Sequence, residues 1–176
     1  MRITGGLLGG RRINIPRGII RPAMDKMRES VFSILGDING KSFLDIFTGS
    51  GIIALEAASR GAGYIEAVEF DPLKRKTLLE NVKISPFHIH CRFMSAELYI
   101  KRAKRFFDYI FLDPPFPYKY KFDLISSIAS SALMNENSLL LIHLPRDESN
   151  KIPPEGLSLL DRREYGRSVV NFLKFI

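Results

Sequence analysis

Hydrophobic positions along the middle of the chain follow two periods in turn. Short apolar runs, rich in branched and aromatic side chains, alternate with stretches in which apolar residues recur every three or four positions. Such runs predict β-strands and such stretches predict helices. The expected strands cover 42–47, 64–70, 87–93, 106–112 and 138–144, and the expected helices between them cover 52–60, 72–82, 96–105 and 122–132. Regular alternation of strand and helix predicts a parallel sheet with helices on both faces.

The C-terminal end departs from this alternation. A polar loop over 145–154 is followed by two apolar stretches, 157–163 and 169–175, that flank Tyr165-Gly166. Two short strands joined through a glycine predict an antiparallel pair that closes the sheet. The fold expected from these patterns is therefore α/β and Rossmann-like, with a mostly parallel sheet of seven strands.

The N-terminal end also has a pattern of its own. Residues 1–15 show weak alternation of apolar side chains interrupted by two glycine pairs, which predicts a small β-hairpin or looped ribbon. Prolines bound a linker over 16–22, and helical spacing runs over 23–35 before a glycine. We therefore expect residues 1–22 to form a basic hairpin and linker extension, and residues 23–176 to form the main domain.

The composition is that of a globular protein able to bury a core. Of the 176 residues, 45% are hydrophobic and 26% are charged. A single cysteine, Cys91, excludes a disulfide framework and a cysteine-based zinc site. The three histidines, His88, His90 and His143, are too scattered for a metal cluster, so no metal is expected. The chain shows no N-terminal apolar segment and no long apolar run, so we expect a cytoplasmic protein that does not span a membrane.

Positive charge is concentrated toward the N-terminus. The whole chain has a net charge of +7, and residues 1–41 alone hold eight basic side chains against three acidic ones. A basic surface of this kind is typical of nucleic-acid-binding proteins. Charge alone would equally suit a basic face whose only role is solubility.

One strand end carries a concentration of hydrogen-bond acceptors. The apolar run 106–112 is followed directly by Asp113, Pro114, Pro115 and Phe116. Two prolines fix their own φ angles, offer no N–H donors and disfavour helical geometry before them, so the chain leaves the strand rigid and extended. The Asp113 carboxylate, two backbone carbonyls and the Phe116 ring then lie together, which suits a planar ring carrying an amino group. The alternative is a polyproline turn with the phenylalanine in the core.

A glycine turn follows the first expected strand of the sheet. Gly49-Ser50-Gly51 with Ala54 satisfies the loose G-x-G-x-x-[GA] pattern of nucleotide-binding folds, although glycine can be needed only for turn geometry. Asp45 stands four residues before Gly49, where it could orient the turn or receive a ligand's ammonium. Glu69 ends the next strand, 20 residues after Gly49, in position to accept both hydroxyls of a ribose. The alternative for Glu69 is a solvated strand end.

NAD and S-adenosylmethionine both contain such a ribose. A dinucleotide site aims its glycine turn at a pyrophosphate, which the acid at position 45 would repel. The ammonium of S-adenosylmethionine tolerates that acid. The chain also leaves no separate substrate domain of the kind that many dehydrogenases carry. Together with the basic charge and the acceptors at 113–116, these features favour methyl transfer.

At these motifs the chain resembles a known family. The segment Asp45-Ile46-Phe47-Thr48-Gly49-Ser50-Gly51 is similar to the first cofactor motif of class I S-adenosylmethionine-dependent methyltransferases. Asp113-Pro114-Pro115-Phe116 is similar to the fourth motif of those that methylate exocyclic amines of nucleobases. The N-terminal block, with Arg2-Ile3-Thr4-Gly5-Gly6 and Arg28-Glu29, resembles the RsmD family and is the more specific match. Those enzymes methylate N2 of one guanine in 16S ribosomal RNA.

The resemblance implies a reaction and a set of site residues. It implies a monomer that converts S-adenosyl-L-methionine to S-adenosyl-L-homocysteine on 16S rRNA, the small ribosomal subunit or an assembly intermediate. The guanine amine would be held by Asp113 and the Pro114 carbonyl, in the segment completed by Pro115, and stacked on Phe116 after the base is flipped out. The cofactor would contact Asp45, Phe47, Thr48, Gly49, Ser50, Gly51, Glu69, Phe70, Ser95, Ala96 and Asp113. Phosphates would be bound by Arg2, Arg11, Arg12, Arg17, Arg21 and Arg28.

Some positions differ from the family pattern. Gly9 stands where arginine is usual, which removes one expected phosphate contact, and Ala23 and Ser33 replace a usual threonine and asparagine. Ser95 stands where an Asp or Asn normally contacts the adenine amine, although a serine hydroxyl can still accept a hydrogen bond. None of these changes removes a group that the chemistry needs.

Two other functions are compatible with the motifs. A methyltransferase acting on DNA adenine N6 or on another base would use the same two motifs, but it usually needs a separate target-recognition region. A non-catalytic RNA-binding or assembly protein could retain the same fold, although Asp113 and Glu69 argue against it. The sequence does not identify the modified nucleotide.

Overall fold

The computed structural model describes residues 1–16, 25–148 and 153–176. Each strand and helix predicted from the apolar pattern corresponds to one of its elements, and a short 3-10 helix, η1, is added. None of the described helices is long and apolar enough to cross a bilayer. The elements are α1 (Asp25–Leu35), β1 (Ser42–Ile46), α2 (Ile52–Ser59), β2 (Tyr64–Glu69), α3 (Pro72–Val82), β3 (Ile89–Phe93), α4 (Ala96–Arg102), β4 (Tyr109–Leu112), α5 (Lys121–Ala129), β5 (Leu139–Pro145), η1 (Arg146–Glu148), β6 (Leu157–Tyr165) and β7 (Ser168–Phe175).

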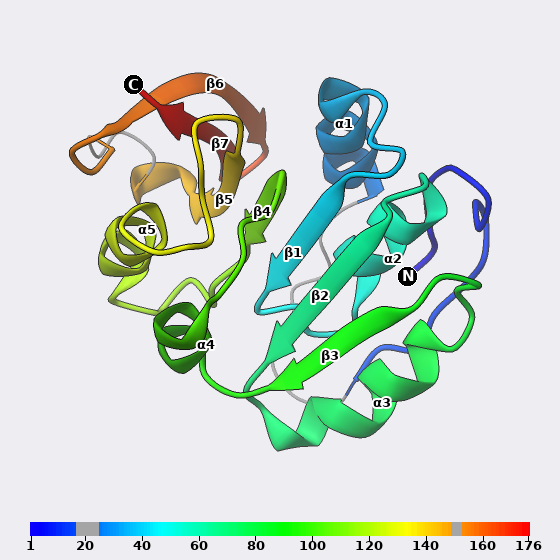
Figure 1. Cartoon of the computed structure of the whole chain (residues 1–176). Coiled ribbons are helices and arrows are strands. Elements are labelled where there is room, and N and C mark those ends of the chain that lie inside the picture. Colours follow the sequence, from blue (N-terminus) through cyan, green and yellow to red (C-terminus); the bar gives the residue numbers. More distant parts are fainter. Residues whose placement is uncertain (17–24, 149–152) are drawn as a thin grey trace.

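The strands form one seven-stranded sheet in the order β3-β2-β1-β4-β5-β7-β6 (Figure 1). Strands β1 to β5 pair in parallel, and β7 pairs antiparallel with both β5 and β6. The chain therefore builds outward from β1 on one side through β2 and β3, and then crosses to the other side of β1 to form β4. Open α/β sheets bind ligands beyond the carboxyl ends of the strands at such a switch point. The predicted sheet is confirmed, and its switch point lies between β1 and β4.

Alternate side chains of each central strand enter two hydrophobic cores, one on each face of the sheet. In β1, Phe43 joins the core that contains α1 and α2, whereas Leu44 and Ile46 join the core that contains α4 and α5. All five residues of β1 are buried, as expected of a strand covered on both faces. Because both faces of the sheet are covered by helices, polar side chains reach solvent and ligands mainly at the ends of the strands.

The N-terminal residues 1–16 pack against α2. Arg2 and Arg12 form an isolated antiparallel bridge, and the N–H of Leu8 donates to the hydroxyl of Ser59 at 2.8 Å. The ribbon shares the core that contains α1 and α2 through its apolar side chains Ile3, Leu8 and Ile13. A looped ribbon is therefore present and packs on α2, whereas most of the predicted linker, 17–22, lies outside the described residues. The division of the chain into an extension and a main domain stays a prediction.

Two elements are shorter than the apolar pattern predicts. β4 begins at Tyr109 and not at 106, because Asp108 turns its carboxylate to the N–H and hydroxyl of Ser42, at 2.8 and 2.7 Å. α4 ends at Arg102 because Ala103 adopts an extended conformation, with φ −61° and ψ 134°. The apolar pattern continues past both boundaries, so periodicity could not locate them.

Candidate active site

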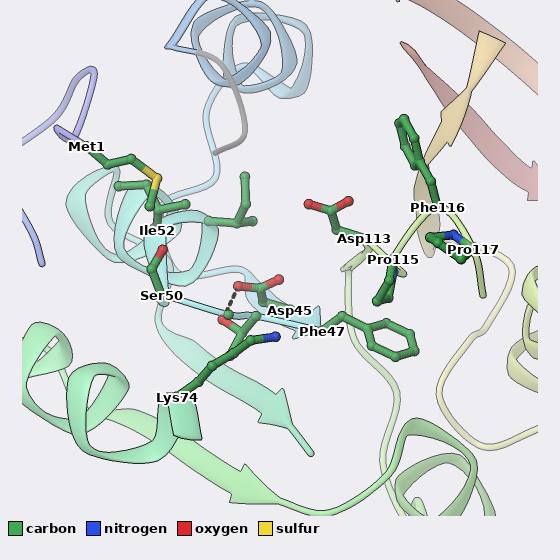
Figure 2. Close-up of a pocket in the computed structure, with 13 residues that line it drawn as sticks. Met1, Asp45, Phe47, Ser50, Ile52, Lys74, Asp113, Pro115, Phe116 and Pro117 are labelled. Carbon is green, nitrogen blue, oxygen red and sulfur yellow. Dashed lines mark hydrogen bonds between the residues drawn. The ribbon is translucent and has the colours of Figure 1, made fainter. Parts of the chain in front are cut away.

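A pocket opens at the switch point between β1 and β4. It is lined by the turn after β1, the start of α2, Lys74 of α3, the segment after β4, and Met1. Its cavity volume is about 100 Å³, and the pocket is partly open to solvent. Figure 2 shows Asp45 and Asp113 between two walls, formed by Met1, Ser50 and Ile52 and by Pro115, Phe116 and Pro117. The glycine turn and the segment after β4 therefore face the same space.

The turn after β1 depends on backbone conformations that few residues adopt. Among the described residues, Phe47 is the one non-glycine residue with a positive φ, 64°. Its ring lines the pocket and packs against the ring of Tyr118 at 5.4 Å. Gly51 has φ 82°, a conformation that favours glycine, and a Cβ there would meet Leu78 Cδ1 at 2.7 Å, so a larger residue would also displace Leu78. Such strained turns are typical of functional sites, where the surrounding packing maintains them.

Asp45 lies in the pocket with one carboxylate oxygen engaged by the turn. Its Oδ2 accepts hydrogen bonds from the Thr48 hydroxyl and from the N–H of Ala54, the latter at 3.1 Å. Its Oδ1 is buried and has no hydrogen-bond partner among the described residues. Burial, together with the negative charges of Asp113 and Glu69, raises the pKa of Asp45 to about 7. A buried oxygen of this kind is a site for a cationic hydrogen-bond donor.

Glu69 supports the glycine turn from the neighbouring strand. Its Oε2 accepts the N–H of Gly49 and its Oε1 accepts the N–H of Asp71, both at 2.8 Å. The residue is 4% exposed, and Lys74 Nζ lies 3.7 Å from Oε1. Glu69 is therefore not a solvated strand end, although it does not itself line the pocket. Each carboxylate oxygen keeps lone-pair capacity for a further donor, such as a ribose hydroxyl.

The segment after β4 is held by contacts at both of its ends. The N–H of Asp113 donates to the carbonyl of Ile46 at 3.2 Å, at the end of β1. Further along, the buried ammonium of Lys121 donates to the Phe116 carbonyl at 2.5 Å and pairs with Glu148 at 2.9 Å. The carboxylate of Asp113 points into the pocket (Figure 2). The segment is therefore fixed by hydrogen bonds at both ends, and Phe116 lies at the pocket wall.

Other residues predicted to contact the cofactor do not line the pocket. Phe70 is 70% exposed, and the Ser95 hydroxyl accepts the N–H of Leu98 at 3.3 Å as the N-cap of α4. The side chain of Ala96 is buried in the core. Phe70 and Ser95 follow the carboxyl ends of β2 and β3, on the same edge of the sheet as the pocket. Their cofactor contacts stay predictions.

The predicted phosphate-binding arginines fall into three groups. Arg2, Arg11 and Arg12 are exposed on the N-terminal ribbon, whereas Arg17 and Arg21 lie outside the described residues. Arg28 is completely buried. Its Nε lies 3.0 Å from Glu56 Oε1, and its Nη2 lies 2.6 Å from the Arg2 carbonyl and 2.8 Å from Asp25 Oδ1. The prediction that Arg28 binds RNA is therefore wrong, because its guanidinium is enclosed where α1, α2 and the ribbon meet.

Two polar side chains of the site were not predicted from the sequence. Lys74 lines the pocket from the first turn of α3, and His143 of β5 lies 2.9 Å from Asp113. Lys74 belongs to no motif, so only its position in space identifies it. The position of His143 near the carboxyl end of β5, the strand next to β4, is the signal that could have identified it. His143 directly follows Ile142, which is the pairing partner of Leu112 in β4.

Comparison with known proteins places the chain in a family. The family model described as "Conserved hypothetical protein 95" matches residues 1–174. "Ribosomal RNA small subunit methyltransferase D" of Haemophilus influenzae is 29% identical over 94% of this chain and 89% of its own length. The solved structure "Putative methyltransferase yhhF from Escherichia coli" is 25% identical, with a TM-score of 0.88 over 99% of this chain and 97% of that one.

A more distant structure shares the fold alone. It is SMU.776, "a putative methyltransferase complexed with SAH", which is 17% identical to this chain, with a TM-score of 0.71 over 88% of this chain and 50% of that one. The family match extends over nearly the whole length, from the N-terminal ribbon to β7. The chain therefore belongs to the family described as Conserved hypothetical protein 95, the RsmD family of methyltransferases.

Proposed function

We propose that this protein transfers a methyl group from S-adenosylmethionine to the exocyclic N2 of a guanine in small-subunit (16S) ribosomal RNA. The observation that carries the proposal is that the glycine turn after β1 and the segment after β4 line one pocket. A methyl donor and an amine acceptor must meet in a shared space, and these segments carry groups suited to each. The relative from H. influenzae, named as a small-subunit ribosomal RNA methyltransferase, supports RNA as the substrate class.

The charges around the pocket suit S-adenosylmethionine. Two carboxylates, Asp45 and Asp113, line it. The ammonium of Lys74 lies 3.7 Å from Glu69 and 3.8 Å from Asp71, so its charge is already partly balanced. The unpartnered Oδ1 of Asp45 would accept the ammonium of the amino acid half, whereas a pyrophosphate would be repelled there. When bound, S-adenosylmethionine supplies an electrophilic methyl group. The fold is also that of the SAH-bound structure SMU.776.

The segment after β4 would hold the target base. Asp113 Oδ1 is engaged by His143, so Oδ2 is the oxygen left to accept an N–H of the amine. Phe116 would stack on the base, a contact worth about 1–3 kcal/mol. Most of the acceleration would come from holding the amine toward the methyl group, which can contribute roughly 7–11 kcal/mol. The proton that the amine loses can pass to Asp113 and then to solvent, because this side chain is 22% exposed.

The affinity for S-adenosylmethionine is expected to rise with pH and to level off near pH 7. The pKa of Asp45 is raised to about 7 in the free protein, so at lower pH binding of the ammonium must first expel a proton. This lowers affinity by up to about tenfold per pH unit below that value. Calorimetry in two buffers of different ionisation enthalpy would count the released protons. Asp45→Asn should remove the pH dependence, whereas Asp123→Asn, at an exposed position, should keep it. Equal affinity at about pH 6 and about pH 8 in the unmodified protein would contradict the role of Asp45.

Arg11 and Arg12 are expected to bind RNA phosphates. Both side chains are exposed on the N-terminal ribbon. Replacing each with glutamine should weaken RNA binding and lower the slope of log affinity against log salt by about 1 per arginine. Fluorescence anisotropy with an rRNA fragment at several salt concentrations measures this slope. Arg163→Gln, exposed on the edge strand β6, is the control and should leave the slope unchanged; an unchanged slope for the ribbon variants would refute the assignment.

One experiment tests the proposed function. The protein is incubated with labelled S-adenosylmethionine and small ribosomal subunits prepared without this modification, and the labelled nucleoside is identified by mass spectrometry after digestion. We expect N2-methylguanosine at one position of 16S rRNA. Label on adenine, or on added DNA and not on rRNA, would replace the proposed substrate with another base amine. Binding of the subunits without any transfer of label would indicate a non-catalytic protein.

A further inference from the structure

His143 contacts both of the residues proposed to hold the target base. Its Nδ1 lies 2.9 Å from Asp113 Oδ1. Its ring meets the ring of Phe116 edge-on, with centroids 5.7 Å apart and an interplanar angle of 65°. His143 is itself 6% exposed, so it supports the pocket wall from behind. In the described part of the chain, no group of metal ligands surrounds this histidine, and it belongs to neither of the two sequence motifs.

The strand register brings these residues together. Leu112 of β4 is the parallel partner of Ile142 of β5, so the next residues, Asp113 and His143, also lie beside each other. Neighbouring strands are about 4.8 Å apart and equivalent positions point to the same face. His143 is also paired with Val170 of β7 on its other side. The histidine is therefore held between two strands, and its contact with Asp113 follows from the architecture of the sheet.

The surroundings of the ring select one tautomer. Nδ1 faces a carboxylate oxygen, which a protonated nitrogen satisfies and a lone pair would oppose. Nε2 is buried and has no hydrogen-bond partner among the described residues. The proton of the neutral ring therefore lies on Nδ1 and is donated to Asp113. A proton moved onto Nε2 would be a buried donor without an acceptor, which is unfavourable.

We propose that His143 is a positioning residue for methyl transfer. Its Nδ1–H binds Oδ1 of Asp113 and so directs Oδ2 toward the target amine. Its ring also packs edge-on against Phe116. The proposal rests on the proposed function, since it assigns Asp113 to the amine. His143 does not take up the proton that the amine loses, because only the enclosed Nε2 could receive one. That proton leaves through the exposed side of Asp113.

Two variants separate the hydrogen bond from the ring contact. His143→Asn places an amide nitrogen close to the position of Nδ1 and keeps a donor, but it removes the ring. His143→Phe keeps a ring against Phe116 but removes the donor. We expect His143→Phe to lower kcat roughly 10- to 100-fold, through misplacement of the carboxylate. His143→Asn should keep kcat within about threefold, and both variants should keep KM for RNA and for S-adenosylmethionine, because the lost interaction acts in the transition state.

Some outcomes would overturn the proposal. An unchanged kcat in His143→Phe would remove any role for the hydrogen bond. A loss in His143→Asn as large as that in His143→Phe would also contradict the proposal, because the asparagine keeps the donor. Thermal unfolding of both variants identifies losses due to misfolding.

A measurement on the unmodified protein covers the case in which the variants do not fold. The ¹⁵N NMR shifts of the His143 ring report its tautomer without any RNA present. We expect the Nδ1–H form, and an Nε2–H form would refute the proposed hydrogen bond. This readout is independent of the substrate. If the unmodified protein fails to methylate rRNA, the proposed function fails while the tautomer result stands, so the two failures can be told apart.

Discussion

Replacement of Asp113 by alanine is expected to reduce methyl transfer by roughly 10²- to 10⁴-fold, the range typical for loss of a positioned acid or base. The carboxylate lines the pocket and is the proposed acceptor for the target amine. The glycine turn, Asp45 and Glu69 remain in place, so the affinity for S-adenosylmethionine should change little. Single-turnover transfer of labelled methyl groups measures the first effect, and calorimetry measures the second.

The control for this experiment is Asp123→Ala. Asp123 is an exposed aspartate on α5, ten residues further along the chain, and its removal should leave turnover unchanged. Normal turnover in Asp113→Ala would remove the catalytic assignment altogether. A variant that instead loses affinity for S-adenosylmethionine, with transfer normal at saturating cofactor, would move Asp113 to the cofactor side of the pocket.

Arg28→Met is expected to lower the free energy of unfolding by about 3 kcal/mol, the lower end of the cost of breaking a buried ion pair, because Glu56 still pairs with Arg60. The side chains of Arg28 and Glu56 are both fully buried and pair at 3.0 Å. Glu56 also accepts the N–H of Thr4 at 2.8 Å, so the loss should loosen the N-terminal ribbon. For a domain whose total stability is about 5–15 kcal/mol this is a large effect. Urea unfolding followed by circular dichroism measures it.

Two further variants test the cause of that loss. Arg12→Ala removes an exposed arginine from the same end of the chain and should change stability by no more than about 0.5 kcal/mol. Combining Arg28→Met with Glu56→Leu should restore only part of the stability, because it removes the buried carboxylate but leaves Arg60 and the N–H of Thr4 without that acceptor. If Arg28→Met kept full stability and weakened RNA binding, Arg28 would be a phosphate contact after all.

The strands, helices and main motifs could be predicted from sequence because their signals are local. The run Phe43–Ile46 and the glycines at 49 and 51 carry their own periodicity and turn geometry, and the prolines at 114 and 115 fix the backbone around them. The chain order of these segments then predicts a parallel sheet. The glycine turn and the Asp113 segment both follow strands of this sheet, so both lie at the edge formed by the carboxyl ends of the strands. The shared pocket of Gly49 and Asp113 follows from that rule.

Some residues have roles that depend on neighbours far away in the chain, and the folded structure is needed to identify these roles. Arg12 and Arg28 are alike in sequence, but Arg28 is enclosed by α1, α2 and the ribbon, and Arg12 faces solvent. His143 belongs to no motif, yet the pairing of β4 with β5 sets it against Asp113. Local periodicity determines which segments become strands and helices. Burial, strand register and the pairing of charges arise between segments far apart in the chain. These interactions determine that Arg28 is structural while Arg12 is exposed, and that His143 contacts Asp113.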